Sequence, residues 1–268
     1  MRLNVVWCQR LRGVFRFFWQ ASRGMAAIVL MCLSAALAVI VFTAWSQMKE
    51  TGHSETDSSA GNRPGWVCGK ISGTVIEVPR HYVLFWPEYE GKSSWEKGFT
   101  ENKKGCDANF SSLSMPLTWP ELRSVSTDEY TKIPYGEFQG VVLTLESASF
   151  VDGHLEKMID ALLDEPASAL EYLDNYRETS GLYFQERDNE YMPGVINGYY
   201  WLRKAGQVPL VFSCQREKTG KARSSCTAYF VIKHTGVLTK AQMSPDKIKE
   251  WSAVIDALST FALSKVKH

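Results

Sequence analysis

The chain has 268 residues, of which 45% are hydrophobic and 12% aromatic, and this composition excludes a disordered protein and provides for a buried core. The net charge is +1, but residues 1–23 contain five arginines and no acidic residue, so the remainder has 25 basic against 29 acidic residues. Because this remainder has no excess of basic residues, we expect no nucleic acid partner for the folded part.

A long apolar segment near the N-terminus predicts a membrane anchor. Residues 24–48 contain no charged residue, and residues 25–45 are almost wholly apolar. About 20 such residues, at a rise of about 1.5 Å each, cross a hydrocarbon layer of about 30 Å. The arginines that precede the segment favour a cytoplasmic N-terminus by the positive-inside rule. We therefore expect a basic cytoplasmic segment over 1–24, one transmembrane helix over 25–45 and export of everything that follows.

Two other targeting signals compete with this interpretation. Ala36-Leu37-Ala38 resembles the A-x-A site of a cleaved signal peptide, but the apolar run continues beyond it to Trp45. Cys32 lies within the run, as the lipidated cysteine of a lipoprotein would, but the bulky Met31 precedes it where a small residue is usual. We expect an uncleaved anchor.

The exported part begins with a tether and continues as one domain. Residues 46–65 are polar, rich in Ser, Gly and Thr, and without apolar periodicity, which is typical of a linker. Residues 66–268 contain no repeat and no second break in composition, so we expect one domain or two packed halves. In the first half, alternating apolar residues predict strands over 71–78, 82–86 and 141–146, with a long irregular stretch over 87–134.

The second half combines two helices with further strands. Over 152–164 the apolar residues change to helical spacing, and we expect that helix to restart over 167–176 after Pro166. Strands are expected over 181–186, 199–203, 208–213, 227–232 and 236–242. Ser244 followed by Pro245 is typical of a helix start, and begins the C-terminal helix. The predicted fold class is α+β, with a mostly antiparallel sheet and two main helices, preceded by the transmembrane helix.

Four cysteines in the exported part predict two disulfides, although four cysteines allow three connectivities. If residues 208–213 and 227–232 pair as a hairpin about Gly220, Cys214 faces Cys226 on the same side as an apolar set. The Cys214–Cys226 pair then leaves Cys68–Cys106 by elimination. A zinc site is the alternative, but it needs close pairs such as C-x2-C, which this sequence lacks. We expect no metal.

The sequence contains no recognisable catalytic motif. It lacks the G-x-S-x-G elbow, the phosphate-binding loop, the G-x-G-x-x-G motif and the H-E-x-x-H motif. Three histidines could serve as a base, namely His81, His154 and His234, but each lies in a polar context typical of a surface residue. We therefore expect neither a cofactor nor an enzyme.

The charges of the second half fall into two blocks. Residues 152–190 have a net charge of −8, and residues 191–240 a net charge of +7. Blocks of this size can select a partner, and they make Asp160 and Asp164 candidate binding residues. Alternatively, the two blocks neutralise each other within the fold.

Aromatic residues are concentrated in the first half, where six of them lie between Tyr82 and Phe99. Trp and Tyr are favoured anchors at protein interfaces because they bury a large area at a small entropic cost. We expect about half of these residues to be core, and Tyr89 or Trp95 to be exposed. The first candidates for partner binding are Trp86, Tyr89 and Trp95.

The sequence resembles the bacterial immunity proteins that neutralise type VI secretion phospholipase effectors in the periplasm. The resemblance spans most of 66–268 and rests on Cys68, Phe85-Trp86-Pro87-Glu88-Tyr89, Lys104-Gly105-Cys106, Met115 to Trp119 with Pro120, the cysteine hairpin and Trp251. It implies an inner-membrane protein whose periplasmic domain binds and occludes a toxic protein effector, with a phospholipase as the expected class. Many such proteins are lipoproteins, and this chain departs from that pattern because it lacks a good lipidation cysteine. The alternative function is a structural or assembly component of an envelope or secretion machine.

Overall fold

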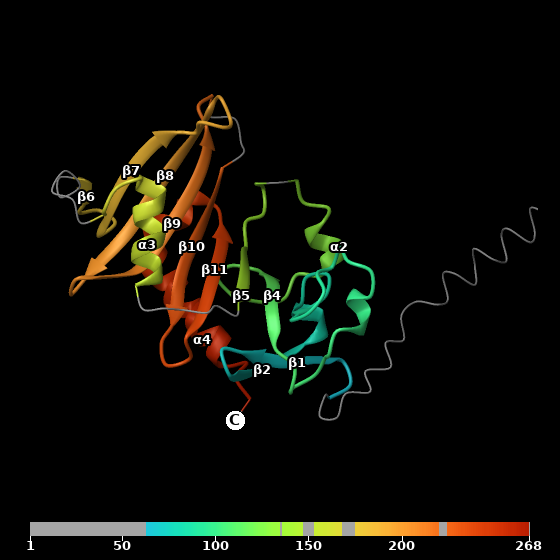
Figure 1. Ribbon diagram of the computed structural model, residues 1–268. Helices are drawn as coiled ribbons and strands as arrows, with labels where there is room; N and C mark the ends of the chain where they lie inside the picture. Colours follow the sequence, from blue (N-terminus) through green and yellow to red (C-terminus); the bar gives the residue numbers. More distant parts are fainter. Residues whose placement is uncertain (1–62, 135, 147–152, 168–174, 220–223, 268) are drawn as a thin grey trace, which may run out of the picture. The chain divides into compact units, whose positions relative to one another are not determined.

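The computed structural model describes residues 63–134, 136–146, 153–167, 175–219 and 224–267 (Figure 1). The chain divides into two compact units, 1–56 and 57–268, and every described residue belongs to the second. Within the described part, no helix is long and apolar enough to cross a membrane. The predicted span over 25–45 and most of the predicted tether lie outside the described residues.

The domain is built on a nine-stranded sheet in which neighbouring strands are antiparallel. The six strands from β6 to β11 follow one another as a meander, and the strands from the first half extend the sheet beyond β11. In spatial order the strands are β3 (Glu88–Tyr89), β4 (Phe110–Leu117), β5 (Val141–Glu146), β11 (Val237–Met243), β10 (Ser225–Ile232), β9 (Gln207–Glu217), β8 (Val195–Lys204), β7 (Leu182–Asp188) and β6 (Tyr176–Arg177).

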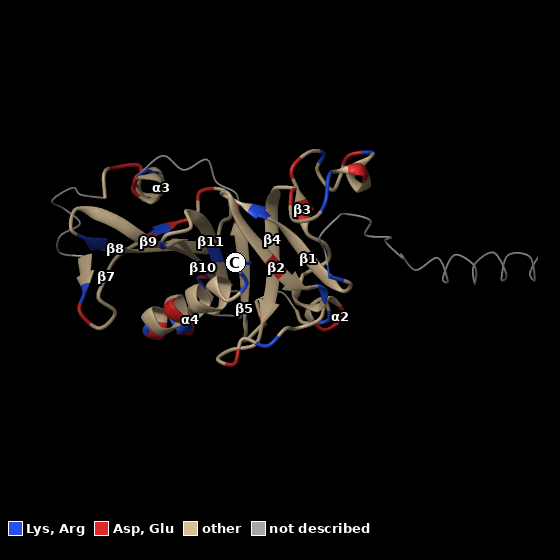
Figure 2. Ribbon diagram, turned by 90° about the horizontal axis from the view of Figure 1, so that it is seen from below, with Lys and Arg blue, Asp and Glu red and all other residues tan. Residues whose placement is uncertain are grey.

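One helix covers each face of the sheet, as Figure 2 shows. Helix α3 (His154–Leu163) buries Leu155, Ile159 and Leu163 in a cluster that includes Trp201 and Val211. Helix α4 (Trp251–Leu263) follows the 3-10 turn η4 (Pro245–Glu250) and packs on the opposite face, where its buried residues join the larger core. The two faces follow from the period of two in a strand, because adjacent residues point to opposite sides.

The predicted strand over 71–78 is wrong, because it crosses a hairpin turn. Strands β1 (Trp66–Ile71) and β2 (Thr74–Pro79) pair in an antiparallel hairpin. Its two turn residues, Ser72 and Gly73, have φ values of 49° and 80°. Two successive positive φ values are typical of the tight turn whose twist matches a β-hairpin. Val266, near the C-terminus, bridges to Ile76 on the other edge of β2.

Two further corrections concern the first half. Residues 82–86 are not a strand, because the 3-10 turn η1 (Arg80–Tyr82) leads into a bend where Phe85 has a positive φ. The irregular stretch over 87–134 contains β3, the 3-10 turn η2 (Phe99–Glu101), β4 and helix α2 (Thr127–Tyr130). Strand β4 lies inside the sheet, and it buries Leu113, Met115 and Leu117 with the period of a strand.

Most predictions for the second half are confirmed. Helix α3, the C-terminal helix and the strands β5 and β7–β11 lie where the periodicity places them. The hairpin register is also confirmed, with Phe212 opposite Ala228 and Leu210 opposite Phe230. The predicted helix over 167–176 is wrong at its end, because Tyr176 begins β6; residues 168–174 lie outside the described part.

Candidate partner-binding surface

Both predicted disulfides are present. Cys214 bonds to Cys226 across β9 and β10, and Cys68 on β1 bonds to Cys106 in the loop before β4. The sulfur atoms of Cys68 and Cys106 and the carboxylate of Glu77 lie within 4.8 Å of one another, which is a distance suited to metal ligands. Because both sulfurs are bonded in the disulfide, they are not available as thiolate ligands in this state.

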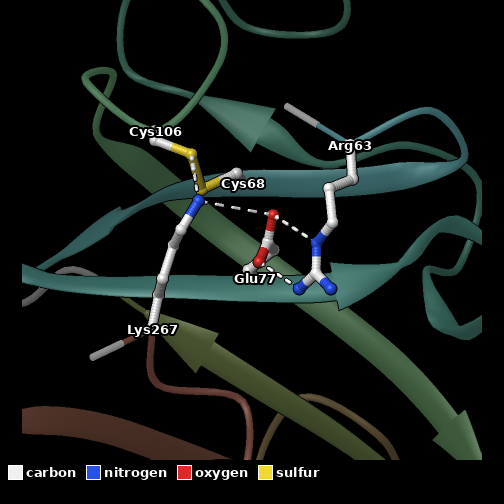
Figure 3. Close-up of polar contacts among 5 residues, drawn as sticks. All are labelled: Arg63, Cys68, Glu77, Cys106 and Lys267. Atoms are coloured by element: carbon white, nitrogen blue, oxygen red, sulfur yellow. Dashed lines mark hydrogen bonds and ion pairs between the residues drawn. A yellow bond between two sulfur atoms is a disulfide. The ribbon is translucent and has the colours of Figure 1, made fainter. Parts of the chain in front are cut away.

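Glu77 is a buried carboxylate that two cations hold, as Figure 3 shows. The Arg63 guanidinium donates to Glu77 at 2.5 Å, and Lys267 Nζ lies 3.6 Å from the other carboxylate oxygen. The hydrogen bond from Arg63 holds the pKa of Glu77 below its ordinary value, against the burial that would raise it. Arg63 and Lys267 belong to the two ends of the described chain, so this cluster fastens the termini of the domain to β2.

A group of exposed or partly exposed aromatic side chains lies on the segment from η1 to η2. Phe85 and Trp86 are each 47% exposed, and Trp95 is 95% exposed. The ring of Trp86 lies between those of Phe85 and Phe99, with centroid distances of 5.9 and 6.0 Å. We call Phe85, Trp86, Trp95 and Phe99 the aromatic ridge.

The backbone of the aromatic ridge is fixed by several side chains. Phe85 has φ 56°, a conformation that costs a bulky residue about 1–3 kcal/mol and persists only where its surroundings enforce it. Here the Arg80 guanidinium donates to the carbonyls of Val83 and Phe85, and the Phe85 amide donates to the hydroxyl of Thr127. Thr127 begins α2, which Ser126 caps. Phe85 and Trp86 are therefore presented from a rigid frame.

Asn102 braces the loop that carries Trp95. Its side-chain oxygen accepts from the Lys92 amide at 3.0 Å, and its amide group donates to the Lys92 carbonyl at 2.7 Å. Within the loop, the Glu96 carboxylate accepts from the Ser93 amide at 2.7 Å, and this bond lowers the pKa of Glu96. These bonds reduce the conformational entropy that the loop would lose on binding a partner.

Tyr89 is not part of this exposed surface. It is 6% exposed, its ring packs on that of Phe110 at 4.7 Å, and its hydroxyl donates to the Cys68 carbonyl at 2.9 Å. Tyr89 therefore belongs to the core, although the sequence made it a candidate anchor. Of the alternatives Tyr89 or Trp95, only Trp95 is exposed.

Asp160 and Asp164 have structural contacts of their own. Asp160 accepts from the Ala167 amide at 2.7 Å, and Asp164 ends α3 with φ 56° and pairs with Arg187 at 3.0 Å. Helix α3 packs on β8 and β9, and four strand spacings of about 5 Å separate β9 from β4. The structure therefore does not bring the two aspartates together with the aromatic ridge.

The two charge blocks meet at one end of the sheet. Arg216 pairs with Glu186 at 3.0 Å, and Lys218 pairs with Asp188 at 2.8 Å. These contacts neutralise part of each block within the fold, which was the alternative interpretation of the sequence. Screening by solvent makes each such surface pair a weak contribution to stability.

A pocket of about 180 Å³ lies next to the frame of the aromatic ridge. Tyr130, at the end of α2, lines it together with Phe138 and Met243. The start of the same short helix holds Phe85 through Thr127. The aromatic ridge and the pocket are thus linked through α2. The sequence analysis selected neither Phe85 as a binding residue nor the residues of the pocket. No local sequence pattern encodes a positive φ or a cavity between distant segments.

The three candidate histidines lie on separate elements. His81 is in η1, His154 begins α3, and His234 has a positive φ in the turn between β10 and β11. A nucleophile, a base and an orienting group must lie within hydrogen-bond reach of one another, and these positions do not assemble such a set.

No family model and no curated protein matches the sequence. Among solved structures, one similar chain is an immunity protein of the Stenotrophomonas maltophilia type IV secretion system, with 10% identity and a TM-score of 0.45 over 81% of this chain and 100% of that one. Another is an iron-regulated outer membrane lipoprotein of Neisseria meningitidis, with 9% identity and a TM-score of 0.43 over 76% of this chain and 93% of that one.

Proposed function

We propose that this chain is a membrane-anchored periplasmic protein that binds a protein partner and, as an immunity protein, occludes a secreted toxic effector, with a phospholipase as the expected effector class. The aromatic ridge is the observation that carries the binding function. Large aromatic side chains on a rigid frame are the typical anchors of tight interfaces, because they bury area without ordering a flexible loop. The two disulfides support export, since such bonds persist in oxidising compartments.

The mechanism that this geometry supports is steric occlusion. Trp95 is almost fully exposed on its loop, and the neighbouring rings of Phe85 and Trp86 form a broader apolar surface. A partner that buries all three would need an apolar surface with a recess for the Trp95 ring. Interfaces of this kind bury about 1,600 Å² in total, of which a few aromatic anchors contribute most of the binding energy.

The test combines crosslinking in cells with a binding measurement. A photoreactive amino acid at position 95 of the full chain should crosslink one partner, which mass spectrometry identifies. The double variant W86A/W95A should then bind that purified partner at least about 30-fold more weakly, which corresponds to the loss of a hot spot of about 2 kcal/mol. Cells that produce the effector should survive with the parent chain and not with this variant.

The matched control is Tyr191→Ala, which removes an aromatic residue that is 92% exposed on the turn between β7 and β8. It should bind and protect as the parent does. Unchanged binding by W86A/W95A would contradict the aromatic ridge as the binding site. The crosslinked partner could instead be a non-toxic subunit of an envelope machine. That result would favour the structural or assembly function.

A further inference from the structure

We propose that the edge of the domain formed by the β8–β9 and β10–β11 turns docks on the anionic phospholipid headgroups of the membrane that holds the chain. This inference rests on the proposed anchor over 25–45 and adds a second contact to it. The residues concerned are Arg203, Lys204, Lys233 and His234, which we call the basic edge.

The sheet register places these residues together. Lys204 pairs with Gln207 around the β8–β9 turn, and Ile232 pairs with Val237 around the β10–β11 turn. Because β9 and β10 pair as far as Leu210 opposite Phe230, the start of β9 and the end of β10 lie at the same end of the sheet. The two turns therefore lie side by side at one end of the sheet.

The positive charge of this end is not neutralised within the described structure. Lys204, Lys233 and His234 are exposed, and none has an ion pair among the described residues. Residues 199–216 and 225–245 contain no acidic residue. The basic block of the sequence is thus divided: Arg216 and Lys218 meet acidic partners at the far end of the strands, Lys240 pairs with Glu146 on β5, and Lys204 and Lys233 have no ion pair among the described residues.

A small apolar surface accompanies the charge. Val231 is 38% exposed and Pro209 is exposed, and each lies one residue beyond the Leu210–Phe230 pair, towards the turns. The Arg203 guanidinium lies 5.9 Å from the ring of Tyr183, on the face that α3 covers. Basic side chains around a limited apolar area are typical of surfaces that rest on anionic lipid.

The path of the chain favours the membrane over another anionic partner. Figure 1 shows the start of β1, the C-terminus and the β10–β11 turn along the same lower side of the domain. The β1–β2 hairpin runs along this side, because Ser72 in its turn donates to the Gly236 carbonyl and Trp66 lies at its other end. Six strand residues span about 20 Å, so the tether joins the domain about 20 Å from the basic edge.

The connection to the proposed anchor is short in sequence. Residues 46–62, 17 in number, separate the proposed span over 25–45 from Arg63, the first described residue, and a fully extended chain of this length reaches no more than about 60 Å. Tethering therefore gives the basic edge a high effective concentration at the membrane, so that weak electrostatic contacts suffice for docking. Docking would also limit the directions in which the aromatic ridge can face.

The test measures lysine acetylation by mass spectrometry on the full chain in lipid nanodiscs. In discs that contain phosphatidylglycerol, Lys204 and Lys233 should be acetylated about fivefold more slowly than in discs of phosphatidylcholine alone. High salt should abolish the difference, since it screens exposed charges. Lys97 and Lys132, which are exposed on other elements, are internal controls and should react at equal rates in both discs.

The variant K204E/K233E should lose the contact between the basic edge and the membrane. The measurement is energy transfer from a label at position 191 to a dye in the headgroup layer, and the efficiency of transfer should change in this variant. The control K97E/K132E should retain it. Equal acetylation in the two kinds of disc would overturn the proposal, and protection that needs an added protein would instead identify a protein partner. If the full chain does not insert into nanodiscs, the proposed anchor over 25–45 is wrong. In that case, failure of the chain to sediment with phosphatidylglycerol vesicles would also contradict docking of the basic edge on anionic lipid.

Discussion

Glu77 shows at the scale of one residue how a buried charge can join two ends of a chain. Its carboxylate pairs with Arg63, which precedes β1, and with Lys267, which follows α4. The Glu77 amide also donates to the Lys265 carbonyl, so backbone and side chain fasten the same segment. Removing the carboxylate would deprive Arg63 and Lys267 of their buried anionic partner, and the free energy of unfolding would fall.

Replacing Glu77 by Gln should lower the free energy of unfolding at neutral pH by about 1–3 kcal/mol. The lower end is expected because Arg63 is 61% exposed and solvent screens the pair. Since folding lowers the pKa of Glu77 below 4.5, the stabilisation is present above pH 4.5 and is lost as the pH falls through the folded-state pKa. Urea denaturation of the parent, E77Q and the exposed control E137Q at several pH values measures both effects.

A parent chain whose stability falls between pH 5 and pH 3 no more than that of E77Q would contradict the role of Glu77. The control Glu137→Gln changes an exposed carboxylate and should follow the parent at every pH.

Tyr89 and Trp95 show that the residue type alone does not determine whether an aromatic side chain is buried or exposed. Both are aromatic and both stand among charged and small residues in the sequence. Tyr89 is fixed in the core because its ring meets Phe110 and its hydroxyl finds the Cys68 carbonyl, whereas Trp95 lies at the tip of a braced loop. Tyr89 is buried because of its contacts with residues about 20 positions away in the sequence. The composition of the neighbouring residues does not predict such contacts.

At the scale of elements, the cysteine hairpin of β9 and β10 is the part of the fold that the alternation of apolar residues predicted most directly. Alternation of apolar residues sets the register of β9 and β10, and a shift by one residue would turn every side chain to the other face. Cys214 then lies opposite Cys226, next to the core residues Phe212 and Ala228. The Cys68–Cys106 bond joins β1 to a loop 38 residues later, so it closes a longer segment.

Removing each disulfide should therefore cost a different amount. In the loop-entropy model, C214S/C226S lowers the free energy of unfolding by about 3 kcal/mol and C68S/C106S by about 4 kcal/mol. Chemical denaturation of the two double variants measures these values, and peptide mapping without reductant verifies the pairs. A Cys68–Cys226 peptide would contradict the hairpin, and a larger loss for C214S/C226S than for C68S/C106S would contradict the dependence on loop length.

At the scale of the whole molecule, the described domain presents two separate features to its surroundings. The aromatic ridge belongs to the segments beside β3 and α2, and the basic edge belongs to turns of the meander. The sheet joins them in one compact unit, 57–268. A protein tethered to a bilayer by residues 46–65 could therefore contact the membrane and a partner at the same time.

The proposed topology has a direct test. A reporter that is active only in the periplasm should be active when fused after His268, and the full chain should resist extraction from membranes by carbonate. A chain that begins at residue 46 behind a cleavable signal peptide is the control, and it should be extracted. Release of the full chain into the soluble periplasm would show cleavage near Ala38 and would contradict the anchor.

The sequence by itself determined the hairpin register with its Cys214–Cys226 pair, α3, the C-terminal helix and the strands β5 and β7–β11, because each depends on periodicity over a few neighbouring turns or strands. The Cys68–Cys106 pair followed by elimination. Strand β4 and the β1–β2 turn were missed, since Ser, Pro and Gly weaken the local pattern there. Only the tertiary structure decided that Tyr89 is buried, that Phe85 is exposed, and that Asp160 and Asp164 lie apart from the aromatic ridge. Such properties depend on contacts between segments far apart in the chain, which no local pattern encodes.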